Sequence, residues 1–174
     1  EISQNYYPDK LAGFFNKDLF VYANVPYKIK SYEEVLRAPK DTIVFDEDLD
    51  HKIRENRDLL GSDGALITDV NGNIHRVNLL EKLLATVLAK LSNFKPEGGI
   101  WRNTQRPEWN DANNALVGNG VSMVTLYYLR RFFTFMDEFF QSDQLDDEIQ
   151  ISEEIADFYH KISQAFENHQ QVLD

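Results

Sequence analysis

The sequence predicts a mainly α-helical fold, and three observations lead to this prediction. Three long stretches, residues 78–94, 121–140 and 151–173, repeat apolar residues at steps of three and four, the spacing of one helix face. Hydrophobic residues make up 43% and charged residues 27% of the chain, a globular balance. Only residues 65–77 have the pattern of a β-hairpin. The 174 residues are within the size of one domain, expected to span residues 1–174.

The first 60 residues are expected to be an irregular segment that packs on the helices. Three of the five prolines lie here, and no helical or strand period is sustained. Ser31 followed by Glu34 has the pattern of a capping box, which predicts a short helix that a proline then ends. A second short, charged helix is predicted over residues 51–60, with Gly61 as its stop signal.

Residues 65–77 are predicted to form the hairpin because two apolar segments flank Asn71-Gly72, a pair that tolerates the positive φ of a tight turn. Asp69, Asn71 and Asn73 also have the spacing of a calcium-binding loop. Gly72 comes two positions too early for that loop, and its final glutamate is out of register. The pattern therefore does not favour a calcium site.

Two of the three long helices have clear start signals. Asn78 can cap the helix over residues 78–94, and a run of Pro and Gly stops it, so that the chain after Gly99 is expected to be a loop. Ser152 precedes two glutamates at the start of the helix predicted over residues 151–173.

The helix predicted over residues 121–140 is apolar on most sides. This pattern predicts that neighbouring elements bury it on several faces. It also contains Arg130 and Arg131, which are costly to bury, so we expect them to pair with acids or to reach a cleft.

The composition excludes several classes of protein. The formal net charge of −11 disfavours nucleic-acid binding. The absence of cysteine excludes disulfides and thiolate chemistry. No apolar run approaches the roughly 20 residues that span a bilayer, so no membrane partner is expected. The four histidines lack metal-ligand spacing, and neither a metal nor a cofactor is predicted.

A long polar loop between two predicted helices, residues 98–120, is the candidate functional site. Long, polar loops of this kind are more often functional than short connections. Trp101 and Trp109 offer flat apolar surface for the C–H face of a sugar ring, beside amides that can bind its hydroxyls. Glu108 and Asp111 are the two carboxylates available for cleavage of a glycosidic bond. The polar residues expected to bind substrate are Arg106, Asn110, Asn113 and Asn114.

The segment Trp109-Asn110-Asp111, preceded by an acidic residue, resembles the Asp-Trp-Asn-Asp segment of the (α/α)6-barrel glycosidases and disaccharide phosphorylases, including the cellobiose phosphorylase group. The resemblance implies that Asp111 is the general acid and that Trp109 contacts the sugar. Glu108 stands where the family has its first aspartate, so this position departs from the family's pattern.

The same resemblance, over residues 79–140, implies a toroid of helical hairpins. One hairpin here already takes up residues 78–141, so the chain is expected to hold only part of an (α/α) toroid-like domain. The remainder is then expected in a longer chain or in another subunit.

The predicted function is therefore that of a carbohydrate-active enzyme, or part of one, of the glycoside hydrolase or phosphorylase type. It would cleave an oligosaccharide or disaccharide by general acid catalysis. One alternative is a structural role, in which Trp109 is a plug and the Asn and Asp side chains satisfy the backbone of the loop. Two others are a non-catalytic carbohydrate-binding domain and a helical module that docks its aromatic helix on another protein.

Overall fold

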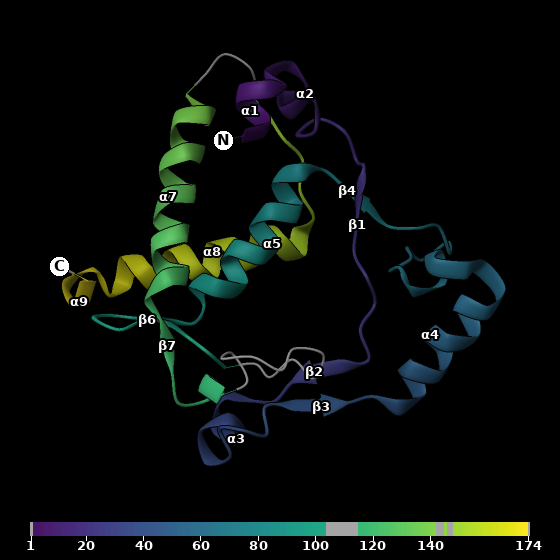
Figure 1. Cartoon of the computed structure of the whole chain (residues 1–174), viewed down its shortest axis with the longest axis horizontal. Coiled ribbons are helices and arrows are strands. Elements are labelled where there is room, and N and C mark those ends of the chain that lie inside the picture. Colours follow the sequence, from purple (N-terminus) through teal and green to yellow (C-terminus); the bar gives the residue numbers. More distant parts are fainter. Residues whose placement is uncertain (1, 104–114, 142–144, 146–147, 174) are drawn as a thin grey trace. The chain divides into compact units, whose positions relative to one another are not determined.

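The structure is a computed structural model that describes residues 2–103, 115–141, 145 and 148–173 (Figure 1). Its contacts divide the chain into two compact units. Unit 1 consists of Glu1–Phe20, Arg76–Ile100 and Met123–Asp174, and unit 2 consists of Val21–His75 and Trp101–Ser122. One domain over residues 1–174 stays a prediction.

The described residues are mainly α-helical, as predicted. The helices of unit 1 are α1 (Ile2–Tyr6), α2 (Pro8–Gly13), α5 (Leu79–Leu91), α7 (Met123–Phe140), α8 (Glu153–Asn168) and α9 (Gln170–Leu173). Those of unit 2 are α3 (Tyr32–Arg37), α4 (Glu47–Leu60) and a 3-10 helix, η1 (Gly61–Ala65). None of the helices in the described part of the chain is long and apolar enough to cross a membrane.

The strands are short and lie in small sheets. They are β1 (Phe20–Val21), β2 (Tyr27–Ile29), β3 (Ile43–Phe45), β4 (Arg76–Val77), β5 (Phe94–Lys95), β6 (Gly99–Trp101) and β7 (Val121–Ser122). Short helices and strands occur within the first 60 residues, and the expectation that these residues form an irregular segment packed on the helices stays a prediction. Its first 20 residues belong to unit 1 and the rest to unit 2.

Helices α5 and α8 pack against each other, and a buried polar contact joins their N-terminal ends. Asn78 caps α5 as predicted, because its Oδ1 accepts the backbone N–H of Glu81 at 3.0 Å. The buried Glu81 carboxylate in turn accepts the backbone N–H of Ser152 at 2.7 Å and its hydroxyl at 2.9 Å. Asn78 also donates its side-chain N–H to the carbonyl of Gln150 at 2.5 Å. Each oxygen of this buried carboxyl group thus accepts a hydrogen bond.

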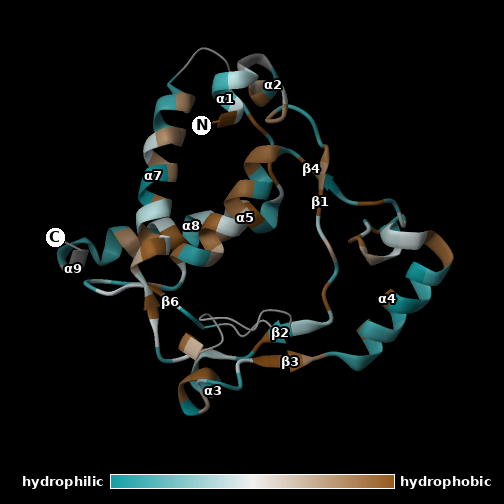
Figure 2. Ribbon diagram, in the orientation of Figure 1, coloured by the Kyte–Doolittle hydropathy of each residue, from teal (hydrophilic) through white to brown (hydrophobic). Residues whose placement is uncertain are grey.

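The core of unit 1 consists of two clusters of apolar side chains. Phe15, Met136 and Phe139 form the first. Val87, Ile100 and Leu129 form the second. In Figure 2, α5 of unit 1 is largely hydrophobic, whereas α4 of unit 2 is largely hydrophilic.

Helix α7 is buried on one side, and its other faces are exposed. Leu129, Met136 and Phe139 are buried, whereas Val124 and Tyr128 are 64% and 66% exposed. The prediction that α7 is buried on several faces is therefore wrong for the described structure, because the apolar clusters of unit 1 contact only one side of it.

The chain after α5 turns back as a hairpin rather than a loop. Strands β5 and β6 pair antiparallel, with Phe94 opposite Ile100. The turn is closed by the N–H of Gly98, which donates to the carbonyl of Lys95 at 3.0 Å. Glu97 adopts a positive φ of 59° within this turn. The expectation of a loop directly after Gly99 is wrong, since Gly99 itself begins β6.

Unit 2 contains a strand pair, a short helix between the two strands in sequence and a longer helix after the second strand. Strands β2 and β3 pair antiparallel, with Tyr27 opposite Phe45. Helix α3 lies between them in sequence and has the predicted capping box of Ser31 and Glu34. Helix α4 ends at Gly61 as predicted, but it begins at Glu47, because Asp46 caps it by accepting the N–H of Leu49.

The predicted hairpin over residues 65–77 is present as a short turn with one antiparallel bridge, Thr68 to Ile74. Gly72 has the expected positive φ of 83°. The Asp69 carboxylate organises the turn by accepting the backbone N–H groups of Asn71 and Asn73 at 2.8 and 2.9 Å. Asp69 thus bonds to the backbone as in an Asx turn. Arg76 and Val77 belong to the separate strand β4.

Candidate functional site

The described structure contains one of the residues predicted for the site and both ends of the loop that carries the others. Trp101 ends β6. The other predicted residues lie outside the described residues, within 104–114: Arg106, Glu108, Trp109, Asn110, Asp111, Asn113 and Asn114.

The two described ends of this loop are joined by backbone hydrogen bonds. The N–H of Arg102 donates to the carbonyl of Gly120 at 2.9 Å. The N–H of Gly118 donates to the carbonyl of Arg102 at 2.6 Å. We call this arrangement of Trp101, Arg102, Gly118 and Gly120 the stem. It brings the start and the end of the candidate loop side by side.

Gly118 is required in the stem for two independent reasons. Its φ of 77° lies in the left-handed region, which favours glycine. A Cβ at this position would also lie 2.2 Å from the carbonyl oxygen of Pro39. A side chain is therefore excluded by backbone conformation and by space, and the stem depends on glycine here.

Trp101 is held in the stem by its indole group. Its Nε1–H donates to the carbonyl of Gly118 at 3.1 Å, and the side chain is half-buried. Because this bond joins the ring to the opposite side of the stem, it restricts the ring's orientation. Trp101 thus has a structural role in addition to the predicted sugar contact.

Tyr32, an aromatic residue that sequence reasoning did not single out, contacts Trp101. The ring centroids are 6.2 Å apart and the ring planes meet at 82°. Tyr32 is the first residue of α3 and is 55% exposed. The only local signal for it is its place directly after the capping residue Ser31, which predicts a helix start but no contact with residue 101.

The capping box of α3 fixes the backbone next to Tyr32. The Ser31 hydroxyl donates to the Glu34 carboxylate at 2.7 Å, and the backbone N–H of Ser31 donates to the same oxygen at 3.0 Å. The hydroxyl bond is the main cause that lowers the pKa of Glu34, and the backbone bond adds to it. The carboxylate that closes the box therefore stays ionised to more acidic pH than usual.

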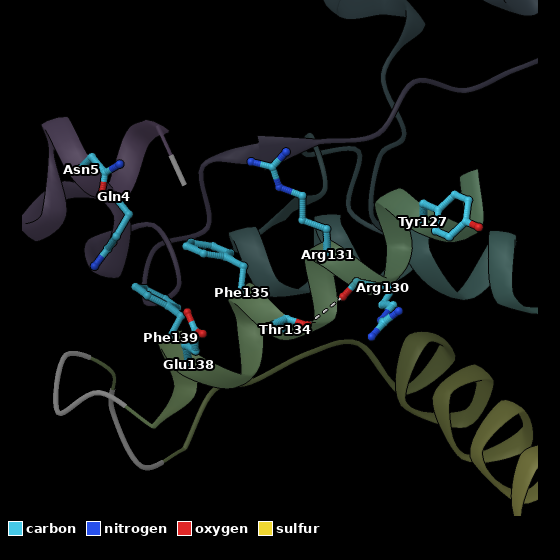
Figure 3. Close-up of a pocket in the computed structure, with 9 residues that line it drawn as sticks. All are labelled: Gln4, Asn5, Tyr127, Arg130, Arg131, Thr134, Phe135, Glu138 and Phe139. Carbon is cyan, nitrogen blue, oxygen red and sulfur yellow. Dashed lines mark hydrogen bonds between the residues drawn. The ribbon is translucent and has the colours of Figure 1, made fainter. Parts of the chain in front are cut away.

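Unit 1 contains a cavity of about 680 Å³ along α7. Figure 3 shows its lining residues on α7, with Gln4 and Asn5 contributed by α1. Arg130 and Arg131 both line it, which confirms the prediction that they reach a cleft. In Figure 3 their guanidinium groups point to opposite sides of α7, so they do not converge on one anion.

The described residues of the stem offer aromatic surface and hydrogen-bonding groups. Within the described ranges, no three His, Cys, Asp or Glu side chains gather as metal ligands would. The arrangement around the stem can present aromatic surface and backbone polar groups to a neutral ligand.

Searches with the sequence found no matching family model and no matching curated protein.

Proposed function

We propose that this chain is a carbohydrate-active enzyme, or part of one, that cleaves a glycosidic bond in an oligosaccharide or disaccharide. The stem is the observation that carries the proposal. It anchors both ends of a loop rich in tryptophan, amide and carboxylate side chains and places Trp101 at its base. A site that carries out catalysis needs its supporting backbone held in place, and the stem supplies this at both described ends.

In this proposal Asp111 is the general acid that protonates the glycosidic oxygen as the bond to the leaving group breaks. Glu108 is the second carboxylate of the loop, and a carboxylate near Asp111 would raise its pKa and keep it protonated near neutral pH. Trp101 and Trp109 would contact the sugar. Arg106, Asn110, Asn113 and Asn114 would bind its hydroxyl groups.

The proposal includes a larger architecture. Helices α5 and α7 would form one helical hairpin of an (α/α) toroid-like domain, whose other hairpins come from a longer chain or another subunit. The exposed apolar side chains of α7 support this arrangement, because Val124, Tyr127 and Tyr128 are each more than 60% exposed. Neighbouring hairpins would remove such side chains from water.

The test is the variant Asp111→Asn in the whole protein, assayed on cellobiose, maltose and laminaribiose with and without inorganic phosphate. Loss of the acid is expected to lower kcat by at least about 100-fold. Asp58→Asn, a change at an exposed carboxylate on α4, is the control and should leave kcat unchanged. Release of sugar 1-phosphate only when phosphate is present would identify a phosphorylase. Parental activity in Asp111→Asn would exclude Asp111 as the acid.

A non-catalytic carbohydrate-binding domain is the second candidate, and the pairing of Tyr32 with Trp101 favours it. Two aromatic rings at the base of the loop suit sugar binding whether or not a proton is transferred. Saturable binding of a disaccharide to the whole protein, with no turnover under any of these conditions, would decide for this candidate.

A further inference from the structure

We infer that Tyr32 is a substrate-binding residue, which together with Trp101 forms an aromatic corner for one neutral sugar ring. The inference rests on the proposed function, since it names a further contact of the same site. It adds a residue from α3, a part of the sequence far from the loop that carries the proposed acid.

The ring of Trp101 has a fixed orientation. Its indole N–H is bound to the carbonyl of Gly118. Gly118 is held in turn by its own N–H bond to Arg102 and by its close approach to Pro39. A ring held in this way loses little conformational freedom when a ligand binds, and this lowers the entropic cost of binding.

The backbone at the start of α3 is also held in place. The capping box holds Ser31 and Glu34, and the next turn of the helix is anchored by Val35, which is 2% exposed. Tyr32 is the first of the three residues between Ser31 and Val35, yet it is 55% exposed. An exposed aromatic residue on a fixed backbone is typical of a binding surface.

The rings of Tyr32 and Trp101 are nearly perpendicular. Their planes meet at 82° with centroids 6.2 Å apart. A nearly perpendicular pair forms a corner in which one ligand ring contacts two aromatic surfaces. The apolar C–H face of a pyranose suits one surface and its edge suits the other.

The charge around Tyr32 favours a neutral ligand. Glu33 and Glu34 follow Tyr32 directly on α3, and the chain carries a net charge of −11. Negative potential of this kind disfavours an acidic sugar. The corner therefore suits a neutral hexose unit rather than a uronic acid.

The experiment measures the affinity of the whole protein for cellobiose, maltose and digalacturonate by calorimetry, without reference to turnover. We expect Tyr32→Ala and Tyr32→Leu to weaken binding of the preferred neutral disaccharide by about 3- to 10-fold. Tyr32→Phe should stay within about twofold, because the flat ring remains. The control is Tyr159→Ala, which removes a tyrosine that is 47% exposed on α8 in unit 1 and should not change the affinity.

The outcomes separate this inference from the proposed function. Unchanged affinity in Tyr32→Ala, together with loss of turnover in Asp111→Asn, would overturn the aromatic corner and leave the acid in place. Weakened affinity in Tyr32→Ala, together with parental turnover in Asp111→Asn, would support the corner and remove the acid. Tighter binding of digalacturonate than of both neutral disaccharides would overturn the assignment of a neutral sugar. No saturable binding of cellobiose, maltose or digalacturonate would overturn the aromatic corner, whereas the proposed function is tested separately by the turnover of Asp111→Asn.

Discussion

The interior of unit 1 and the interior of unit 2 are stabilised by different kinds of contact. Unit 1 buries large side chains, above all Phe15, which is 1% exposed within the cluster that includes Met136. Among the described residues of unit 2, no aromatic side chain is fully buried. Unit 2 buries smaller side chains, among them Val35 and Val117, and in it backbone segments also approach each other closely. A Cβ on Gly64 would lie 2.3 Å from the backbone of Asn56, and one on Gly118 would lie 2.2 Å from that of Pro39.

This difference indicates which changes each unit tolerates. Removal of side-chain volume leaves a cavity in unit 1, whereas addition of a single methyl group displaces backbone in unit 2. The candidate site lies in the second kind of structure, where the path of the backbone itself sets the position of Trp101. Four predictions test or refine the comparison.

The largest effect is expected from Phe15→Ala, which should lower the free energy of unfolding of unit 1 by about 3–5 kcal/mol. Urea denaturation followed by hydrogen exchange of peptides from each unit measures it. Peptides from α5 and α7 should lose protection first. The matched control is Phe133→Ala, since Phe133 is 41% exposed on α7 and should cost about 1 kcal/mol or less. Equal losses in the two variants would contradict the assignment of Phe15 to the core.

The next largest effect is expected from Gly118→Ala in unit 2. The left-handed backbone costs an alanine about 1–2 kcal/mol, and the clash with Pro39 adds about 1–3 kcal/mol. Hydrogen exchange should show lost protection at the amides of Arg102 and of residue 118, which donate the two hydrogen bonds of the stem, with unit 1 unchanged. Gly72→Ala is the control, because Gly72 has a similar φ of 83° but open space around it. If both variants cost the same, the contact with Pro39 is unimportant.

A third prediction concerns the polar contact within unit 1. Glu81→Ala should cost roughly 1–3 kcal/mol, because the partly buried N–H of Ser152 loses its acceptor. Glu81→Gln should cost less, since the amide oxygen can accept this N–H and the Ser152 hydroxyl can rotate to accept from the amide nitrogen. Denaturation of both variants by urea measures the difference. A larger cost for glutamine than for alanine would show that the contact is not as described.

The smallest effect is expected from the turn at Asp69 in unit 2. Its pKa is lowered, first because the carboxylate accepts the backbone N–H of Asn73 and further because it accepts that of Asn71. The folded pKa is therefore below the unfolded one. The stability that the carboxylate contributes is fully present above the pKa of the unfolded state, about 4. It is lost as the pH falls through the pKa of the folded state.

The amide resonance of Asn73, followed by NMR as the pH is lowered, checks this prediction. Its titration midpoint should lie below the ordinary range for aspartate, and Asp69→Asn should abolish the transition. A midpoint at or above the ordinary aspartate value would show that these hydrogen bonds do not persist in solution.

Local signals in the sequence predicted the helices well. Asn78 and Ser31 were identified as caps because a capping side chain bonds to a backbone group only three residues away. The pairing of β2 with β3 could not be predicted in this way. Tyr27 and Phe45 meet only because α3 and its flanking turns return the chain, and no local pattern encodes that return.

The candidate site shows the same limit. Trp101 was singled out because a tryptophan in a polar loop suits a sugar, but its bond to Gly118 depends on where the loop ends. Tyr32 was missed because its contact with Trp101 joins two distant parts of the sequence. The glycine at 118 was a visible signal, since glycine often marks a close approach of backbone segments, but the sequence did not show that Pro39 is the neighbour.

The turn between β5 and β6 has a consequence for how this chain can change by mutation. Glu97 stands at the position of positive φ that a turn of this kind usually gives to glycine or asparagine. At most surface positions glycine loosens a protein, but here it would relieve the strain of a left-handed glutamate. A β-branched residue at position 97 would increase that strain. Glu97→Gly would therefore stabilise the hairpin of β5 and β6, although a substitution by glycine usually destabilises a fold.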